Sequence, residues 1–312
     1  MVPVPLLPGN PQPVLVNWLP VGLGCCVARE TYTAMNKHIR LLTLAAAMLA
    51  LFSSVGCSKL RARDQLNKGV TAYKNAKYEE AIDHFQQAVA LDPKLINAKM
   101  YLATAFAQQY IPGADTPENN QMAEQAIEQY KRVLEMNPAR DQKVNAAKGI
   151  AYLYLNMKKF DDAKKYYRMA ADIDPNDPEP YYSVGVIDWT ACYQPRMEER
   201  AKLGLKPDEN LNPKNKDQKK ACDELKVKNG PSIQEGIDSL NQAIKLRPDY
   251  DDAMAYLNLM YREKADVECD DMSARQEDLK TADHWVDETL ITKKAKAEKQ
   301  PGQQGITMDQ PK

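Results

Sequence analysis

The residues of this chain that could do chemistry are its cysteines and histidines, and their spacing does not build a reactive centre. Cys192, Cys222 and Cys269 show no CxxC spacing, and His84 and His284 form no ligand pair with them. We therefore expect no metal site. The sequence also contains no P-loop, HExxH, GxSxG or GxGxxG motif, and this predicts no catalytic residues, no cofactor and no small-molecule substrate.

Pairs of acidic residues, which can act as catalytic dyads, occur at positions 79–80, 161–162 and 251–252. Each pair lies at the start of a predicted helix. Carboxylates there complement the helix dipole. We interpret these pairs as helix-stabilising residues and assign them no catalytic role.

The elements that position these residues come from a segment that occurs four times. AIDHFQQAVALDP runs from Ala81 to Pro93, and related segments occupy 126–138, 163–175 and 236–248. Each copy has a small residue, a large apolar residue four positions later and a smaller apolar residue three further on, which places all three on one face of a helix. The final proline predicts the end of that helix. The large residues are Phe85, Tyr130, Tyr167 and Leu240.

A second helical pattern precedes each copy and carries its own small residue, at Gly69, Ala103, Ala151 and Gly185. Paired helices that repeat about every 34 residues resemble the tetratricopeptide repeat (TPR) family. The resemblance covers residues 63–296, with four strong copies and a weaker fifth. It implies an all-α fold, an α-solenoid of about five helix pairs.

Repeats two, four and five are longer than the others because each carries an insertion between its first and second helix. The insertion of repeat two, at 111–121, is polar and contains proline and glycine, which predicts a loop. The longest insertion, at 190–230, contains Pro195, Pro207 and Pro213. We expect short helical turns at 196–203 and 218–227, with the rest mobile.

The amino-terminal segment has the pattern of a secretion signal that starts late. Residues 1–28 contain no charge, but Lys37 and Arg40 precede an uncharged apolar run at 41–52. The run fits a signal peptide at 35–56 and is too short to span a bilayer comfortably. We therefore predict that translation starts at Met35 and that residues 1–34 are an artefact of start-site choice.

The end of this segment, Val55 and Gly56 before Cys57, resembles the lipobox of bacterial lipoproteins. That resemblance implies lipidation of Cys57, with residues 57–62 as a linker to the solenoid. Ser54 departs from the family, which prefers leucine, so a cleaved unmodified signal and an uncleaved anchor stay open. Ser58 in place of aspartate implies the periplasmic face of the outer membrane.

An oxidising compartment also predicts a disulfide. Cys192 and Cys222 bracket the long insertion and would close it at its base, while Cys269, in the insertion of repeat five, is the rival partner. The tail at 297–312 has a composition typical of disorder.

The TPR resemblance implies that partners bind to the face lined by first helices. An apolar and aromatic groove suits an extended or helical peptide segment. The predicted groove residues are Leu66, Val70, Tyr73, Met100, Tyr152, Asn156, Tyr182, Val186 and Trp189, accompanied by Thr104, Lys148, Leu259 and Arg262.

With a formal net charge of −1, the chain shows no basic footprint for nucleic acid. We therefore expect a lipid-anchored periplasmic scaffold that binds other proteins in envelope assembly. Two alternatives stay open, an enzyme or redox protein that uses the cysteines of the insertions and a soluble cytosolic TPR adaptor.

Overall fold

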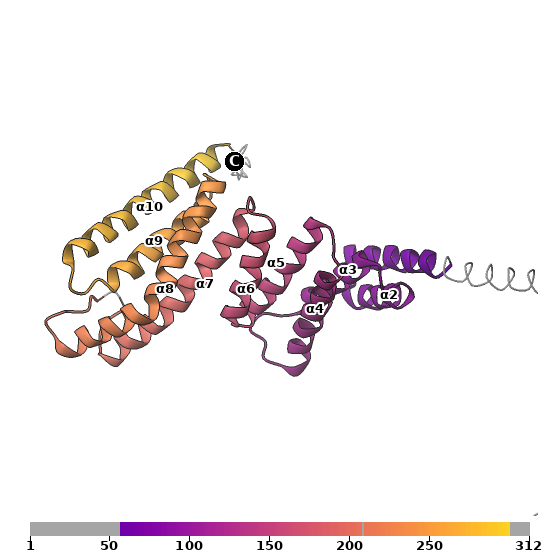
Figure 1. Ribbon diagram of the computed structural model, residues 1–312, viewed down its shortest axis with the longest axis horizontal. Coiled ribbons are helices and arrows are strands. Elements are labelled where there is room, and N and C mark those ends of the chain that lie inside the picture. The colour runs from indigo at the N-terminus through magenta and orange to yellow at the C-terminus, as the bar shows by residue number, and fades with distance from the viewer. Residues whose placement is uncertain (1–56, 208, 300–312) are drawn as a thin grey trace, which may run out of the picture. The chain divides into compact units, whose positions relative to one another are not determined.

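The computed structural model describes residues 57–207 and 209–299, and this part of the chain consists of helices and short connections (Figure 1). The predicted all-α solenoid of five helix pairs is confirmed in this part. The pairs are the helix at 57–74 with α2 (Tyr78–Leu91), α3 (Ile96–Gln109) with α4 (Pro117–Glu135), α5 (Arg140–Asn156) with α6 (Phe160–Ile173), α7 (Pro178–Lys202) with α8 (Lys216–Leu246), and α9 (Asp251–Asp266) with α10 (Met272–Lys299).

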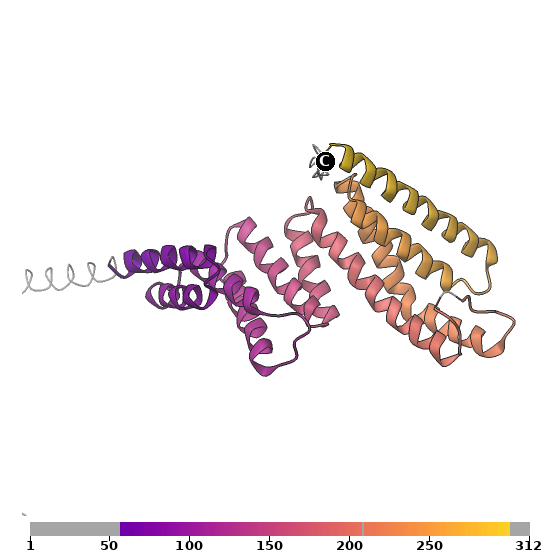
Figure 2. The same cartoon turned by 180° about the vertical axis from the view of Figure 1, so that it is seen from behind.

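Each labelled helix packs on the next one in the chain, from α2 through to α10. The same order is visible from both sides of the molecule (Figure 2). First helices also contact one another directly: α3 contacts α5, and α7 contacts α9. The two first helices within each of these two sets therefore lie close enough to share a surface.

The packing within pairs follows the repeated small and large residues. A Cβ atom built on Gly69 would lie 2.5 Å from the ring of Phe85, and one on Gly185 would lie 2.4 Å from Leu240. In the third pair, Ala151 and Ala163 share a buried apolar cluster. The helix register predicted from the sequence thus holds in these three pairs.

Helix ends follow local signals in the sequence. The side chains of Thr116 and Asp177 accept hydrogen bonds from backbone N–H groups at the starts of α4 and α7, and Asn215 does the same for α8. A proline at the first helical position follows both Thr116 and Asp177. The capping side chains satisfy backbone N–H groups that have no acceptor within the helix, and proline removes one such N–H group.

The longest insertion differs from the prediction. The segments at 196–202 and 218–227 are helical, as expected, but they are not separate turns in a mobile loop. They continue α7 and α8, which run for 25 and 31 residues and meet at a connection over 203–215. Pro195 and Pro231 lie inside these helices, where each removes one backbone hydrogen bond without ending the helix.

The insertion of repeat two is also more helical than predicted, because α4 begins at Pro117 and only the residues before it form a loop. Residues 57–62 are helical and continuous with the first helix. The predictions for residues 1–34 and 35–56 lie outside the described residues, as does the tail from residue 300 onwards. Residues 297–299, which were predicted to belong to the disordered tail, instead form the end of α10.

Candidate functional site

Five aromatic residues gather on neighbouring first helices. Tyr182, Trp189 and Tyr193 follow one face of α7, since their spacing of seven and then four residues matches the helical period. Tyr256 on α9 meets Tyr182 and Trp189 edge to face, at ring distances of 5.8 and 5.5 Å. Tyr250, just before α9, lies 4.9 Å from Tyr182. We call these five residues the aromatic cluster.

The aromatic cluster is partly open to solvent. Tyr182, Trp189 and Tyr256 are half-buried, while Tyr193 is 36% exposed. Burial raises the pKa of Tyr182 to about 12 and also raises that of Tyr250. Both hydroxyls are therefore neutral at physiological pH. The cluster presents apolar ring surface and neutral phenol groups, which suits an amphipathic ligand.

Two guanidinium groups border the aromatic cluster. Arg196 lies 5.3 Å from the centre of the Tyr193 ring, and Arg247 lies 4.3 Å from that of Tyr250. Such contacts are favourable because the ring face carries negative charge. Each guanidinium group is also paired with carboxylates, so the border of the cluster carries charges of both signs.

The predicted groove residues divide into groups. None is fully buried, but Leu66, Val70, Tyr73 and Met100 pack against the apolar core of the first repeats. Tyr152 is 51% exposed. Asn156 donates a hydrogen bond to its carbonyl oxygen at 2.8 Å.

On α7, Tyr182 and Trp189 belong to the aromatic cluster. Val186, which lies between them in the sequence, is half-buried. Two accompanying residues are engaged internally, Thr104 with the hydroxyl of Tyr130 at 3.1 Å and Lys148 with Asp177 at 2.8 Å. Only the prediction for repeat four thus coincides with a gathered set of aromatic residues.

Sequence reasoning missed Tyr193, Tyr250 and Tyr256. Tyr193 follows Trp189 by one helical turn, so it would have been found had residues 190–202 been assigned to the helix. Tyr256 lies off the positions expected for repeat five, where Leu259 and Arg262 were selected. Its contacts depend on how α9 packs against α7, which the sequence of either helix alone does not show.

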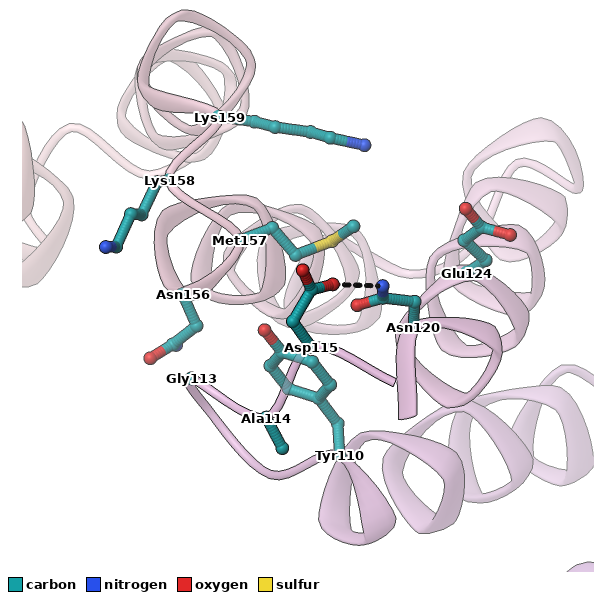
Figure 3. Close-up of a pocket in the computed structure, with 10 residues that line it drawn as sticks. All are labelled: Tyr110, Gly113, Ala114, Asp115, Asn120, Glu124, Asn156, Met157, Lys158 and Lys159. Atoms are coloured by element: carbon teal, nitrogen blue, oxygen red, sulfur yellow. Dashed lines mark hydrogen bonds between the residues drawn. The ribbon is translucent and has the colours of Figure 1, made fainter. Parts of the chain in front are cut away.

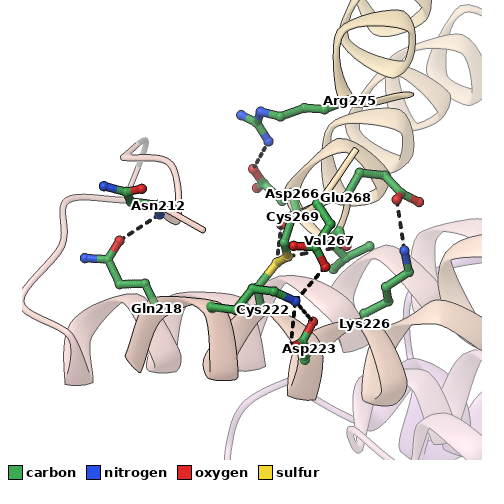
Figure 4. The surroundings of a disulfide bond; sticks show 12 residues. Asn212, Gln218, Cys222, Asp223, Lys226, Asp266, Val267, Glu268, Cys269 and Arg275 are labelled. Atoms are coloured by element: carbon green, nitrogen blue, oxygen red, sulfur yellow. Dashed lines mark hydrogen bonds and ion pairs between the residues drawn. A yellow bond between two sulfur atoms is a disulfide. The ribbon is translucent and has the colours of Figure 1, made fainter. Parts of the chain in front are cut away.

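The disulfide joins Cys222 to Cys269, with 6.3 Å between their Cα atoms (Figure 4). The expected pairing of Cys192 with Cys222 is therefore wrong, and Cys222 pairs with Cys269. Cys192 and Cys222 do not close a loop at its base, because both residues lie within helices. Cys192 faces Asn229, whose amide donates to its carbonyl oxygen at 3.1 Å, and Cys222 lies two turns, about 10 Å, away along α8.

Cys192 is a buried thiol. Burial raises its pKa to about 12, so the unreactive protonated form dominates. With Cys222 and Cys269 joined, the described cysteines give little support to a redox centre. No group of three or more His, Cys, Asp or Glu residues within the described ranges could hold a metal ion.

A cavity of about 450 Å³ lies between the α3–α4 loop and the turn that follows α5 (Figure 3). Asp115 on the loop accepts a hydrogen bond from Asn120 at 3.1 Å. Lys158 and Lys159 line the cavity from the turn. Its lining therefore contains groups of both charge signs.

Two parts of the sequence match models of the tetratricopeptide repeat, one over residues 62–95 and the other over residues 120–184. The chain is a tetratricopeptide-repeat protein. The aromatic cluster lies on α7 and at α9, which are the first helices of repeats four and five. No curated protein matches the sequence.

Several solved structures resemble this TPR chain at low identity. The structure of the MamA protein is 12% identical, covers 78% of this chain and 97% of its own, and gives a TM-score of 0.51. MamA from Desulfovibrio magneticus RS-1 is 14% identical, with coverages of 75% and 96% and a TM-score of 0.48. YrrB, described as a TPR protein with an unusual peptide-binding site, is 12% identical, with coverages of 75% and 90% and a TM-score of 0.45. These similarities concern the fold alone.

Proposed function

We propose that this TPR protein is a scaffold that binds a peptide or helical segment of a partner protein through the aromatic cluster. The observation that carries the proposal is the gathering of half-buried rings from α7 and α9 on adjacent first helices. Peptide recognition of this type seats apolar anchors in a groove. Aromatic residues are also enriched among those that dominate binding energy at protein interfaces.

Site-specific photo-crosslinking tests this proposal. A photoreactive phenylalanine analogue at Tyr193, introduced in the full-length protein in its native cells, should crosslink to a defined partner. The matched control is Tyr101 on α3, which is similarly exposed, at 40%, but lies outside the aromatic cluster. Trp189→Ala should reduce crosslinking from position 193 while the helical circular dichroism stays unchanged. Equal crosslinking from both positions, or indifference to Trp189→Ala, would overturn the proposal.

We further propose that the protein is held by a lipid on Cys57 at the periplasmic face of the outer membrane, where it serves envelope assembly. The lipobox-like sequence before Cys57 supports this location. Two features are compatible with it, the exposed thiol of Cys57 and the Cys222–Cys269 disulfide, since disulfides persist in oxidising compartments. Within the described residues, no helix is both long and apolar enough to cross a membrane.

The lipid anchor is tested by Cys57→Ala. The unaltered protein should float with membranes in a density gradient and incorporate a fatty-acid probe, because several acyl chains give stable anchoring. Cys57→Ala should lose both properties. Cys192→Ala is the matched control, since that cysteine is buried and its loss should leave flotation and labelling unchanged. Release of an unlabelled wild-type protein into the soluble fraction would refute the anchor.

A further inference from the structure

A cavity of about 360 Å³ lies where α7, α9, α10 and the connection after α7 meet. Its wall contains Arg196 and Arg200 from α7, Arg262 and Asp266 from α9, and Arg275 from α10. We call it the arginine cavity. Four guanidinium groups and a single carboxylate line it. The cavity exists because the long insertion extends α7 beyond the length of the other first helices.

The carboxylates around the arginine cavity are shared among the arginines. Asp266 alone lies 2.8 Å from Arg196, 3.1 Å from Arg200 and 3.4 Å from Arg275. Two further acidic groups touch its walls. Glu263 lies 3.0 Å from Arg196, and the exposed Asp283 lies 2.8 Å from Arg262.

Three described carboxylates therefore face four permanent cations. Burial also raises the pKa of Glu263 to about 7, so that group carries only part of its charge near neutral pH. The cavity retains an excess of positive charge.

Arg200 gives independent support for a ligand. The residue is only 2% exposed. Its Nε atom donates to the carbonyl oxygen of Glu209 at 3.0 Å, and Nη2 pairs with Asp266. The remaining nitrogen, Nη1, has no acceptor among the described residues. A buried guanidinium N–H without an acceptor is costly. Nη1 is enclosed in this structure, so an oxyanion in the cavity would pair with it after a shift of the Arg200 side chain toward the cavity.

The arginine cavity is continuous with the aromatic cluster. Tyr193 belongs to both, and Arg196 lies over the Tyr193 ring while lining the cavity. A segment seated on the aromatic cluster can therefore place a neighbouring side chain at the cavity. Planar guanidinium groups match carboxylates because two parallel hydrogen bonds can form.

We propose that the arginine cavity binds the carboxylate of an acidic side chain in the partner segment. This inference rests on the proposed peptide-binding function and adds a chemical requirement to it. The partner sequence should carry an aspartate or glutamate close to the apolar residues that contact the aromatic cluster. Substituting that residue by its amide should weaken binding.

The test uses N-acetylglutamate α-amide, a probe with one carboxylate and no peptide partner. In the full-length protein labelled with [¹⁵N]arginine, the probe should shift the Nε–Hε signals of Arg196 and Arg200 saturably. Its isosteric glutamine analogue should have no effect, nor should chloride at matched ionic strength. Arg262→Gln should weaken probe affinity about tenfold, the loss expected for one charge-assisted hydrogen bond.

The control is Arg140→Gln. Arg140 is exposed like Arg262 and pairs with Asp174 at 2.9 Å, in a repeat far along the chain from the cavity. This variant should leave probe affinity unchanged. Both variants alter one exposed ion pair and should keep the fold.

Three results would overturn the proposal. These are the absence of a saturable shift, an equal response to the glutamine analogue, and tighter binding of inorganic phosphate than of the probe, which would indicate a site for free phosphate. The outcome of the probe-binding experiment can be distinguished from that of photo-crosslinking at position 193. Probe binding without crosslinking would retain the carboxylate site and remove the aromatic docking surface.

Discussion

The first three helix pairs and the last two are held together differently. In the described residues up to Ile173, the helices after the first have 14 to 19 residues and pack through alanine, glycine and aromatic rings. From Pro178 onwards, three of the four helices have at least 25 residues. Of the buried charged residues described, only Lys99 belongs to the first part, while Asp188, Arg200, Glu263 and Asp278 belong to the second. The disulfide also lies there.

This difference shows how a repeat fold accommodates longer helices. Extended helices project beyond the repeating apolar interface, so their added length needs another means of attachment. Here Arg196 and Arg200 tie α7 to Asp266 of α9, and Cys222 ties α8 to Cys269. Buried ion pairs add little net stability but are costly to break. The second part should therefore be more sensitive to loss of individual polar partners.

The largest expected effect is that of removing the disulfide with Cys222→Ser and Cys269→Ser. The bridge closes a sequence separation of 47 residues, for which the chain-entropy model gives a loss of about 4 kcal/mol in the free energy of unfolding. Thermal unfolding of the wild type with and without reductant measures this effect. The second part should unfold at lower temperature after reduction. Reductant should not alter the double variant further, and a reductant-insensitive wild type would contradict the prediction.

The next largest effect is expected for Arg200→Met. Losing the guanidinium removes one partner of Asp266 and the donor to the Glu209 carbonyl. Because Asp266 keeps Arg196 and Arg275, we expect a loss of about 3 kcal/mol, the lower end for a broken buried pair. Native-state hydrogen exchange should show lost protection in α7, α9 and α10, because each repeat contacts only its neighbours.

A matched exposed arginine provides the control for this variant. Arg140→Met removes a surface ion pair with Asp174 and should cost at most about 1 kcal/mol. Loss of protection spread evenly over α2 to α10 in Arg200→Met would show that the two parts are not distinct.

The same comparison explains what the sequence could predict. Pairs such as Gly69 with Phe85 and Ala151 with Ala163 recur at fixed spacing, so periodicity alone locates them and gives the helix register. Such contacts are local within one repeat. The five pairs and the interface between their helices were therefore predictable.

The ionic contacts were not predictable, because they join residues far apart whose types do not recur. Arg196 and Asp266 are 70 positions apart, and Lys164 bonds to Glu235 over 71. Pro195 also favoured a loop at this position, since proline usually ends a helix. Assigning the insertion to a loop concealed Tyr193 and the true position of Cys222. The aromatic cluster and the arginine cavity both depend on that extended helix.

A smaller effect is expected at the junction of the two parts. Ala163 is buried with Tyr167 of its own helix and with Val184 and Ile187 of α7. Ala163→Leu should overpack this cluster at a cost of roughly 1 to 3 kcal/mol. Because the cluster spans the junction, protection in hydrogen exchange should fall on both sides, in α5 and α6 as well as in α7. Lys165→Leu, at an exposed position of α6, should leave protection unchanged, and an unaltered melting temperature in Ala163→Leu would mean that the helix register is wrong.

The smallest effect is a pH dependence confined to the second part. Burial raises the pKa of Glu263 to about 7 from an ordinary value of 4.5, and that of Asp188 to about 6 from 3.8. Between the ordinary and the raised values, the folded protein holds protons that the unfolded chain has released. Stability therefore falls as pH rises through this window. Ion pairing lowers the pKa of Glu235 and Asp251. These two groups make the folded state more stable as pH rises, but that contribution to stability is lost only at a lower pH than this window.

Urea unfolding followed by the fluorescence of Trp189 and Trp285, both in the second part, measures this dependence. The free energy of unfolding should be greater at pH 5.5 than at pH 7.5, by on the order of 1 kcal/mol. Glu263→Gln should remove most of the difference, because the amide does not titrate. Glu79→Gln, at an exposed position of α2, should retain it. A stability that instead rises with pH over this interval would show that Glu263 and Asp188 are ionised in the folded protein, and the interior of the second part would then be a fully charged network.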